Sequence, residues 1–76
     1  MFSYTVAKTA DEKAFVKACR SIESQFKGIG KGKALTDVDG SVIQIYHKGN
    51  DSIKVYNDYE VDAVYVDSDI ELKNIF

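Results

Sequence analysis

The stretch of the sequence that most suggests chemistry combines lysine with glycine: Lys27-Gly28-Ile29-Gly30-Lys31-Gly32-Lys33. Glycines allow backbone N–H groups to converge on an anion, and lysines add positive charge. One interpretation is an anion site in which Lys27, Lys31 and Lys33 contact the phosphates of nucleic acid or of a nucleotide. However, the spacing is not that of a nucleotide-binding loop, and the stretch leaves a predicted helix. We therefore favour a flexible helix-to-strand connection.

Other reactive residues are too few or too isolated to predict an active site. Cys19 and His47 are the only cysteine and the only histidine. Cys19 falls on the apolar side of a predicted helix, where a thiol acts as a small hydrophobic group. The segment Asp37–Gly40 begins like a calcium loop, but Val42 and Lys48 occupy the positions where an EF-hand requires Gly and Glu. We therefore predict no enzymatic activity, no metal site and no cofactor.

The remaining candidate site combines tyrosines with carboxylates in residues 46–69. Tyrosine rings supply contact area at a small entropic cost, and nearby carboxylates steer a basic partner. The predicted partner-binding residues are Tyr46, Tyr56, Asp58, Tyr59, Glu60, Asp62 and Val64. In the alternative, the C-terminal Leu72, Ile75 and Phe76 fold back over this surface and cover it.

The charge of the chain is distributed unevenly, although its net value is only −2. Residues 1–48 carry eight basic and five acidic side chains, whereas residues 49–76 carry two basic and seven acidic ones. Such asymmetry can steer a charged partner, but two oppositely charged faces that neutralise each other within the molecule would give the same counts.

These observations favour a binding protein over an enzyme. We expect a small acidic protein-interaction module, an inhibitor or adaptor, that binds a basic surface of another protein and imitates nucleic-acid phosphates there. The alternative is a polyanion- or nucleic-acid-binding protein that uses the lysines of residues 27–33 together with Lys13, Lys17 and Arg20 of the predicted helix.

The composition sets the frame for the fold. With 76 residues, 45% of them hydrophobic and 29% charged, the chain is predicted to form a single domain over residues 1–76. Its longest apolar run is too short to span a bilayer. A single cysteine cannot form an internal disulfide, and the N-terminal residues lack the pattern of a signal peptide, so we expect a cytoplasmic location.

The most strongly patterned element is a helix over residues 10–26. Its apolar residues form one stripe, which consists of Phe15, Ala18, Cys19, Ile22 and Phe26. The segment Thr9–Glu12 fits a capping box with Thr9 as the N-cap.

Alternating apolar residues predict strands over 2–6, 34–38, 41–47, 52–57 and 61–66. Three turns connect the last four strands: a type I′ turn at Asp39-Gly40, a three-residue turn at 49–51 and another at 58–60. Because loop length sets which side chains share a face, these turns direct Ile43, Ile45, Ile53, Val55, Val61 and Ala63 toward the helix. They direct Val42, Tyr46, Tyr56, Val64 and Val66 away from it.

The predicted fold class is therefore α+β, with one amphipathic helix packed on a small, mainly antiparallel sheet in the order β-α-β-β-β-β. Residues 69–75 fit either a short C-terminal helix or an edge strand. We favour the helix, because Ser68–Glu71 forms a second capping-box pattern.

Overall fold

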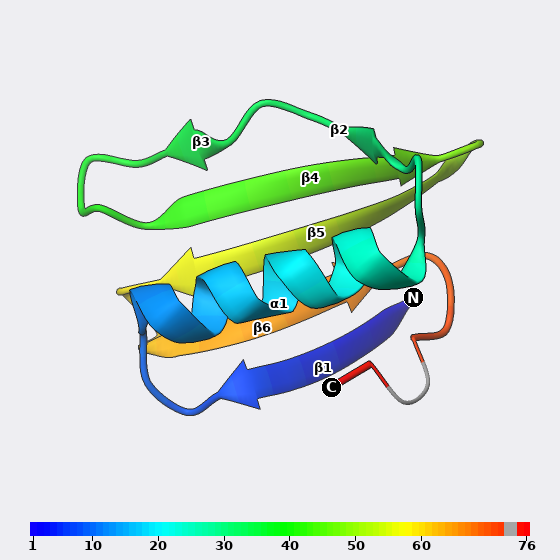
Figure 1. The fold of residues 1–76 in the computed structure, drawn as a ribbon. Helices are drawn as coiled ribbons and strands as arrows, with labels where there is room; N and C mark the ends of the chain where they lie inside the picture. Colours follow the sequence, from blue (N-terminus) through cyan, green and yellow to red (C-terminus); the bar gives the residue numbers. More distant parts are fainter. Residues whose placement is uncertain (73–74) are drawn as a thin grey trace.

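The computed structural model describes residues 1–72 and 75–76, and within them it consists of one helix packed on one antiparallel sheet (Figure 1). The elements are β1 (Phe2–Ala7), α1 (Glu12–Gln25), β2 (Gly30–Lys31), β3 (Leu35–Thr36), β4 (Val42–Lys48), β5 (Asp51–Asp58) and β6 (Ala63–Ser68). The strand order is β1-β6-β5-β4-β2, and β3 also pairs with β4. The predicted α+β class, with its helix on a meander that the N-terminal strand joins, is confirmed. The strand predicted over 34–38 is reduced to the short β3.

The helix begins later than its sequence predicts. Asp11, not Thr9, is the N-cap, and its carboxylate accepts a hydrogen bond from the Lys13 N–H at 3.0 Å. The backbone before α1 is held by the sheet instead: the Ala10 N–H donates to Asp62 and the Asp11 N–H to Asn57, at 2.8 and 3.0 Å. These long-range hydrogen bonds fix where the helix starts, and the local capping pattern at Thr9 does not.

The hydrophobic core lies between α1 and the sheet. The helix contributes Ala18, Cys19 and Ile22, as its apolar stripe predicts. The sheet contributes Tyr46, Ile53, Val55 and Val66, and Leu72 joins them from the C-terminal segment. Every one of these side chains is less than one-tenth exposed.

The turn between β3 and β4 differs from the predicted type I′ turn. The Asp37 N–H donates to the Ser41 carbonyl at 2.8 Å, so the loop contains residues 38–40. Within it only Gly40 has a positive φ, of 89°, whereas a type I′ turn requires positive φ at both central residues. This three-residue loop pairs Leu35 with Ile43 and shifts the register by one residue.

The next two turns also differ in length from the prediction. Lys48 pairs with Asp51, so the loop after β4 has two residues, and Asp58 pairs with Ala63, so residues 59–62 form the loop after β5. Partners across a sheet share a face, and each one-residue error therefore exchanges the two faces of a strand.

Several predicted orientations are wrong for this reason. Tyr46, Val64 and Val66 are buried under α1, whereas Ile43, Ile45 and Ala63 lie on the other face and Val61 is exposed in a turn. The predictions for Ile53, Val55 and Tyr56 are confirmed.

The C-terminal segment lies on the helix side of the sheet. The Leu72 N–H donates to the Tyr4 hydroxyl at 2.8 Å, and Leu72 is buried in the core. The alternative in which this segment covers the opposite face is therefore wrong. Residues 69–72 are irregular rather than helical, and residues 73–74 of the predicted helix lie outside the described residues. In the part of the chain that the structure describes, no helix is both long and apolar enough to cross a membrane.

Candidate protein-binding surface

The face of the sheet that points away from α1, here called the outer face, carries aromatic and aliphatic side chains. Tyr56 and Tyr65 are cross-strand partners whose rings stack with centroids 4.5 Å apart and planes 12° apart. Ile43 and the exposed Leu35 lie on the same face, toward β3. Because α1 and the C-terminal segment both lie on the opposite side, these apolar groups face solvent (Figure 1).

A hollow of about 310 Å³ opens where the outer face meets the loops that follow β3 and β5. Its lining includes the apolar Leu35, Val42, Ile43 and Tyr56 and the acidic Asp37, Asp39, Asp58 and Glu60. We call it the acidic hollow. Its volume lies at the lower end of the range for ligand sites, which suits one long side chain of a partner better than a large free ligand.

Hydrogen bonds hold the two loops beside the hollow in place. The Tyr59 N–H donates to the Ser41 hydroxyl at 2.9 Å, which joins one loop to the other. One carboxylate oxygen of Asp58 accepts from the Glu60 N–H at 2.9 Å, and the other accepts from the Tyr65 hydroxyl at 3.3 Å. The hollow is thus formed before a partner arrives, which reduces the entropy lost on binding.

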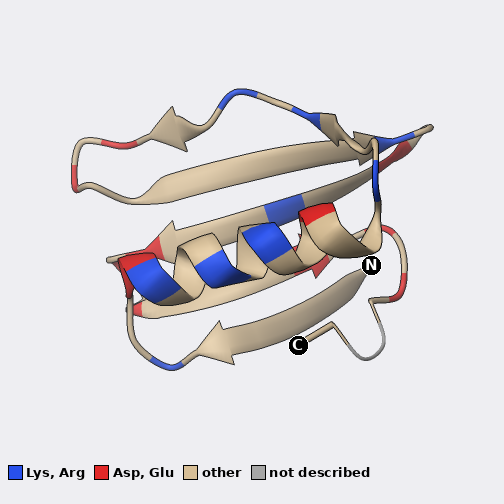
Figure 2. Cartoon of the chain, viewed as in Figure 1, with Lys and Arg blue, Asp and Glu red and all other residues tan. Residues whose placement is uncertain are grey.

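The hollow lies at the acidic end of the molecule, a name we use for residues 10–12, 37–41 and 58–62 together. Seven of the twelve acidic side chains lie in these segments, and no lysine or arginine does: Asp11, Glu12, Asp37, Asp39, Asp58, Glu60 and Asp62. Figure 2 shows acidic segments at this end, where α1 begins and the two loops meet, and further acidic residues at the other end of the molecule. Such a concentration of one sign of charge attracts a basic partner from a distance.

Two ionisable groups beside the hollow have altered pKa values. The Ser41 N–H, which donates to Asp39 at 2.9 Å, lowers the pKa of that carboxyl group. Burial, reinforced by the Asp58 carboxylate, raises the pKa of Tyr65 to about 12. At neutral pH Asp39 is therefore charged and Tyr65 remains a neutral hydrogen-bond donor.

Large apolar side chains project from the same end. Val38 is fully exposed at the tip of its loop, Val61 is 63% exposed, and Tyr59 is 49% exposed. Exposed apolar groups that gather in one place and are surrounded by charge are typical of protein-binding surfaces.

The structure brings most of the predicted partner-binding residues together. Tyr56, Asp58, Tyr59, Glu60 and Asp62 all lie at or beside the acidic end.

Tyr46 and Val64 do not belong to this surface, because both are fully buried beneath α1. The Tyr46 hydroxyl donates to Glu23 at 2.5 Å, and burial together with this hydrogen bond raises the pKa of the tyrosine. The prediction that Tyr46 faces outward is wrong because the turn at Gly49-Asn50 has two residues, which pairs Tyr46 with the buried Ile53.

Sequence analysis missed the other half of the surface, namely Leu35, Asp37, Val38 and Asp39. These residues belong to the basic half of the sequence, and Asp37 and Asp39 were assigned to a hairpin turn alone. The meander contained a usable signal, because alternate loops of a meander lie at the same end of the sheet. The loops after β3 and β5 therefore had to meet, as the hydrogen bond between Tyr59 and Ser41 shows.

The lysine- and glycine-rich stretch connects the helix to the edge of the sheet, and its residues Gly30–Lys31 form β2 instead of a flexible connection. The Gly32 N–H donates to the Ile45 carbonyl at 2.8 Å and is thus not directed at an anion. A Cβ atom at Gly32 would lie 3.0 Å from the same oxygen, so glycine is needed for this close approach. Lys31 forms an ion pair with Glu23 at 3.1 Å.

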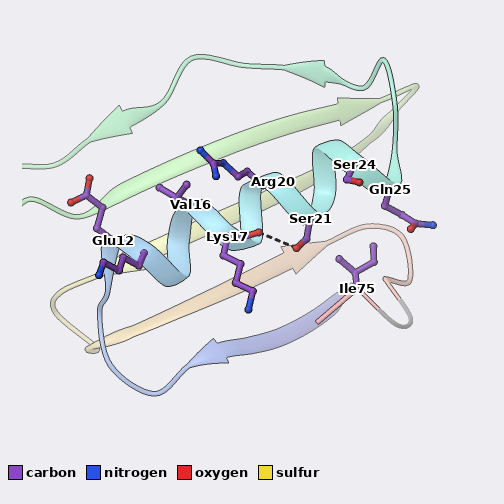
Figure 3. Close-up of a pocket in the computed structure, with 9 residues that line it drawn as sticks. Glu12, Val16, Lys17, Arg20, Ser21, Ser24, Gln25 and Ile75 are labelled. Atoms are coloured by element: carbon purple, nitrogen blue, oxygen red, sulfur yellow. Dashed lines mark hydrogen bonds between the residues drawn. The ribbon is translucent and has the colours of Figure 1, made fainter.

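The basic residues of the helix line a separate, open depression on its solvent side (Figure 3). Lys13, Lys17 and Arg20 contribute to it together with Glu12. In Figure 3 Arg20 points toward the β4 side of α1 and Lys17 toward the β1 side. The two side chains therefore point to opposite sides of the helix.

No protein-family model matches this chain, and no curated protein or solved structure matches it.

Proposed function

We propose that this chain is a protein-interaction module that binds a basic surface of a partner protein through the acidic end and the adjoining outer face. The observation that carries the proposal is the acidic hollow. It combines an apolar lining of Leu35, Ile43 and Tyr56 with four carboxylates on loops held by hydrogen bonds. Neither feature alone would define the partner, but together they match a basic side chain with a long apolar stem.

The two kinds of lining residue have different roles in this proposal. The carboxylates lie on exposed loops, where they accelerate encounter with a basic surface and lose this effect as salt rises. The stacked Tyr56 and its aliphatic neighbours stay in contact after docking and slow dissociation, as buried aromatic groups do at other interfaces.

A surface of this kind fits an inhibitor or an adaptor. A basic groove that normally holds nucleic-acid phosphates has the charge that the acidic end complements. Occupation of such a groove would exclude the nucleic acid without any chemical step. The competing function, direct binding of a polyanion by the helix, is the less supported one because Lys17 and Arg20 diverge and Lys31 is paired with Glu23.

The proposal is tested by capture from cytosolic extract on the immobilised chain, once without nuclease and once with nuclease added. We compare the wild type with two altered chains, Leu35→Ser/Tyr56→Ala in the apolar lining and Asp37→Asn/Glu60→Gln in the acidic lining. The matched control is Asp51→Asn/Glu71→Gln, which removes the same charge outside the acidic end.

We expect a protein that is retained by the wild type and the control, is lost from the apolar variant, and is released from the acidic variant at lower salt. Equal retention by all four chains would contradict the proposal. Retention that disappears when nuclease is added would instead indicate polyanion binding.

A further inference from the structure

The second feature that points to a partner is the free edge of the sheet at β1. β1 is the terminal strand of the sheet and pairs only with β6. Figure 1 shows β1 along one border of the sheet, with no other strand beyond it. Among the described residues, no hydrogen bond joins the backbone of Phe2–Ala7 to any segment other than β6. An extended segment could therefore pair with the unused backbone groups.

The opposite edge of the sheet is protected against such pairing. It is covered by β2 and β3, each of only two residues, with an irregular segment between them. This edge carries Lys31 and Lys33, and Gly30 and Gly32 lie against the backbone of β4. Short strands and lysines are the usual means by which natural sheets prevent edge-to-edge contact.

β1 has almost none of these protective features. Its residues Phe2–Ala7 include no charged side chain, no proline and no glycine. The strand consists largely of β-branched and aromatic residues, which favour extended structure. A bulge lies between Thr5 and Ala7, so the strand remains regular from Phe2 to Thr5.

Exposed apolar side chains accompany this edge on the helix side. Phe2 is 41% exposed and Phe76 is 44% exposed. Phe76 packs against Tyr4, with ring centroids 6.0 Å apart, and Tyr4 is two residues from Phe2 along the same side of β1. The edge therefore has both unpaired backbone groups and exposed apolar side chains beside them, and together these favour the binding of another strand more than either does alone.

We propose that β1 is a self-association edge, at which a second copy of this chain adds its own β1 in antiparallel orientation about a two-fold axis. Such symmetry places the strand opposite itself. Like charges opposite each other would oppose this pairing, and Phe2–Ala7 carries none. A basic partner is not indicated here, because Phe2–Ala7 carries no acidic side chain to attract one.

The dimer would place two binding surfaces on one assembly. Ala7 is at the end of β1 nearest the acidic end, because residues 8–11 lead directly to the start of α1. An antiparallel β1 pair therefore directs the two acidic ends in opposite directions and leaves both acidic hollows open. This inference does not depend on the proposed function, since no residue of the hollow takes part.

The test is sedimentation equilibrium of the 76-residue chain over about 1 μM to 1 mM, a range that covers the dissociation constants expected for a small interface. We expect the mass of a dimer at the upper concentrations. Ser3→Lys/Thr5→Lys places two positive charges on β1 and should shift the dissociation constant upward at least tenfold. The matched control, Ala34→Lys/Thr36→Lys, adds the same charge at the opposite edge and should dimerise like the wild type.

A second measurement does not require any variant to fold. An excess of a synthetic peptide with the sequence of residues 1–8 should compete for the edge and convert the dimer to monomer. A monomeric mass at every concentration would overturn the proposal. So would a dimer that resists both the peptide and the β1 charges, or one that is lost in the control.

Discussion

Tyr46 and Tyr56 are alike in sequence context, since both lie in alternating strands of the same meander, yet they have opposite roles. Tyr46 is fully buried under α1, with its hydroxyl on Glu23. Tyr56 lies on the outer face, stacked on Tyr65 and exposed to the acidic hollow. The comparison teaches that, in this sheet, loop length assigns a tyrosine to the core or to a binding surface, and residue type does not.

The largest effect should come from removing the buried ring. Tyr46→Ala leaves a cavity in the core and removes the hydrogen bond to Glu23, so we expect a loss of about 3–5 kcal/mol in the free energy of unfolding. Tyr56→Ala loses one aromatic contact at the surface and should cost only about 1 kcal/mol. Urea denaturation of both variants measures the difference. Equal losses would mean that the two tyrosines are not on opposite faces.

The second effect concerns binding, and here the substitution of Tyr56 should matter more than that of Tyr46. Once a partner is captured, Tyr56→Ala should weaken its affinity by about 2 kcal/mol, as expected of an aromatic residue at the centre of an interface. Tyr46→Phe keeps the ring buried and should leave the affinity unchanged. Titration calorimetry at a fixed salt concentration measures the affinity of each variant for the partner. An unaltered affinity of the Tyr56 variant would remove the hollow from the binding surface.

The contrast also shows how far the sequence determines the fold. The helix was predictable because Ala18, Cys19 and Ile22 recur at helical spacing, and the strands were predictable because apolar residues alternate. The sequence does not predict which face of each strand is buried, since in β4 Val42 and Tyr46 alternate with Ile43 and Ile45. When both alternations are apolar, the pattern gives a strand without indicating which side is buried.

The candidate site was predictable in part for the same reason. Asp58, Glu60 and Asp62 stand out as a local concentration of charge in a turn. Leu35 and Asp37 enter the site only through the approach of a distant loop, and the contact between Ser41 and Tyr59 that produces it has no local signature.

A third, smaller effect distinguishes another pair of similar residues, Thr9 and Asp11. Asp11 caps α1, so Asp11→Ala should lower the free energy of unfolding by about 1 kcal/mol. Thr9 is exposed and outside the helix, and Thr9→Ala should change it by less than about 0.5 kcal/mol. The comparison is made from urea midpoints at constant slope. A larger loss of unfolding free energy for Thr9→Ala than for Asp11→Ala would mean that Thr9 is the N-cap, as the local sequence suggests.

The smallest expected effect is a difference in pH dependence between Tyr46→Phe and Tyr56→Phe. The hydrogen bond from Tyr46, followed by Lys31, lowers the pKa of Glu23 in the folded protein. A carboxyl group whose pKa is lowered on folding contributes stability above its unfolded pKa, which is about 4.3, and loses that contribution as the pH falls through the folded value. Tyr46→Phe removes the main cause of the shift.

The stability gap between the wild type and Tyr46→Phe should therefore narrow as the pH falls from 7 toward 3, because protonation of Glu23 progressively removes its contribution. Tyr56 has no such carboxylate partner among its contacts described above, so the gap for Tyr56→Phe should stay constant over the same range. Other carboxyl groups, such as Asp39, titrate in all three chains and cancel in each difference. Urea midpoints at the two pH values measure both gaps. A gap for Tyr46→Phe that does not narrow in acid would show that the hydroxyl contributes little to holding Glu23 in its charged form.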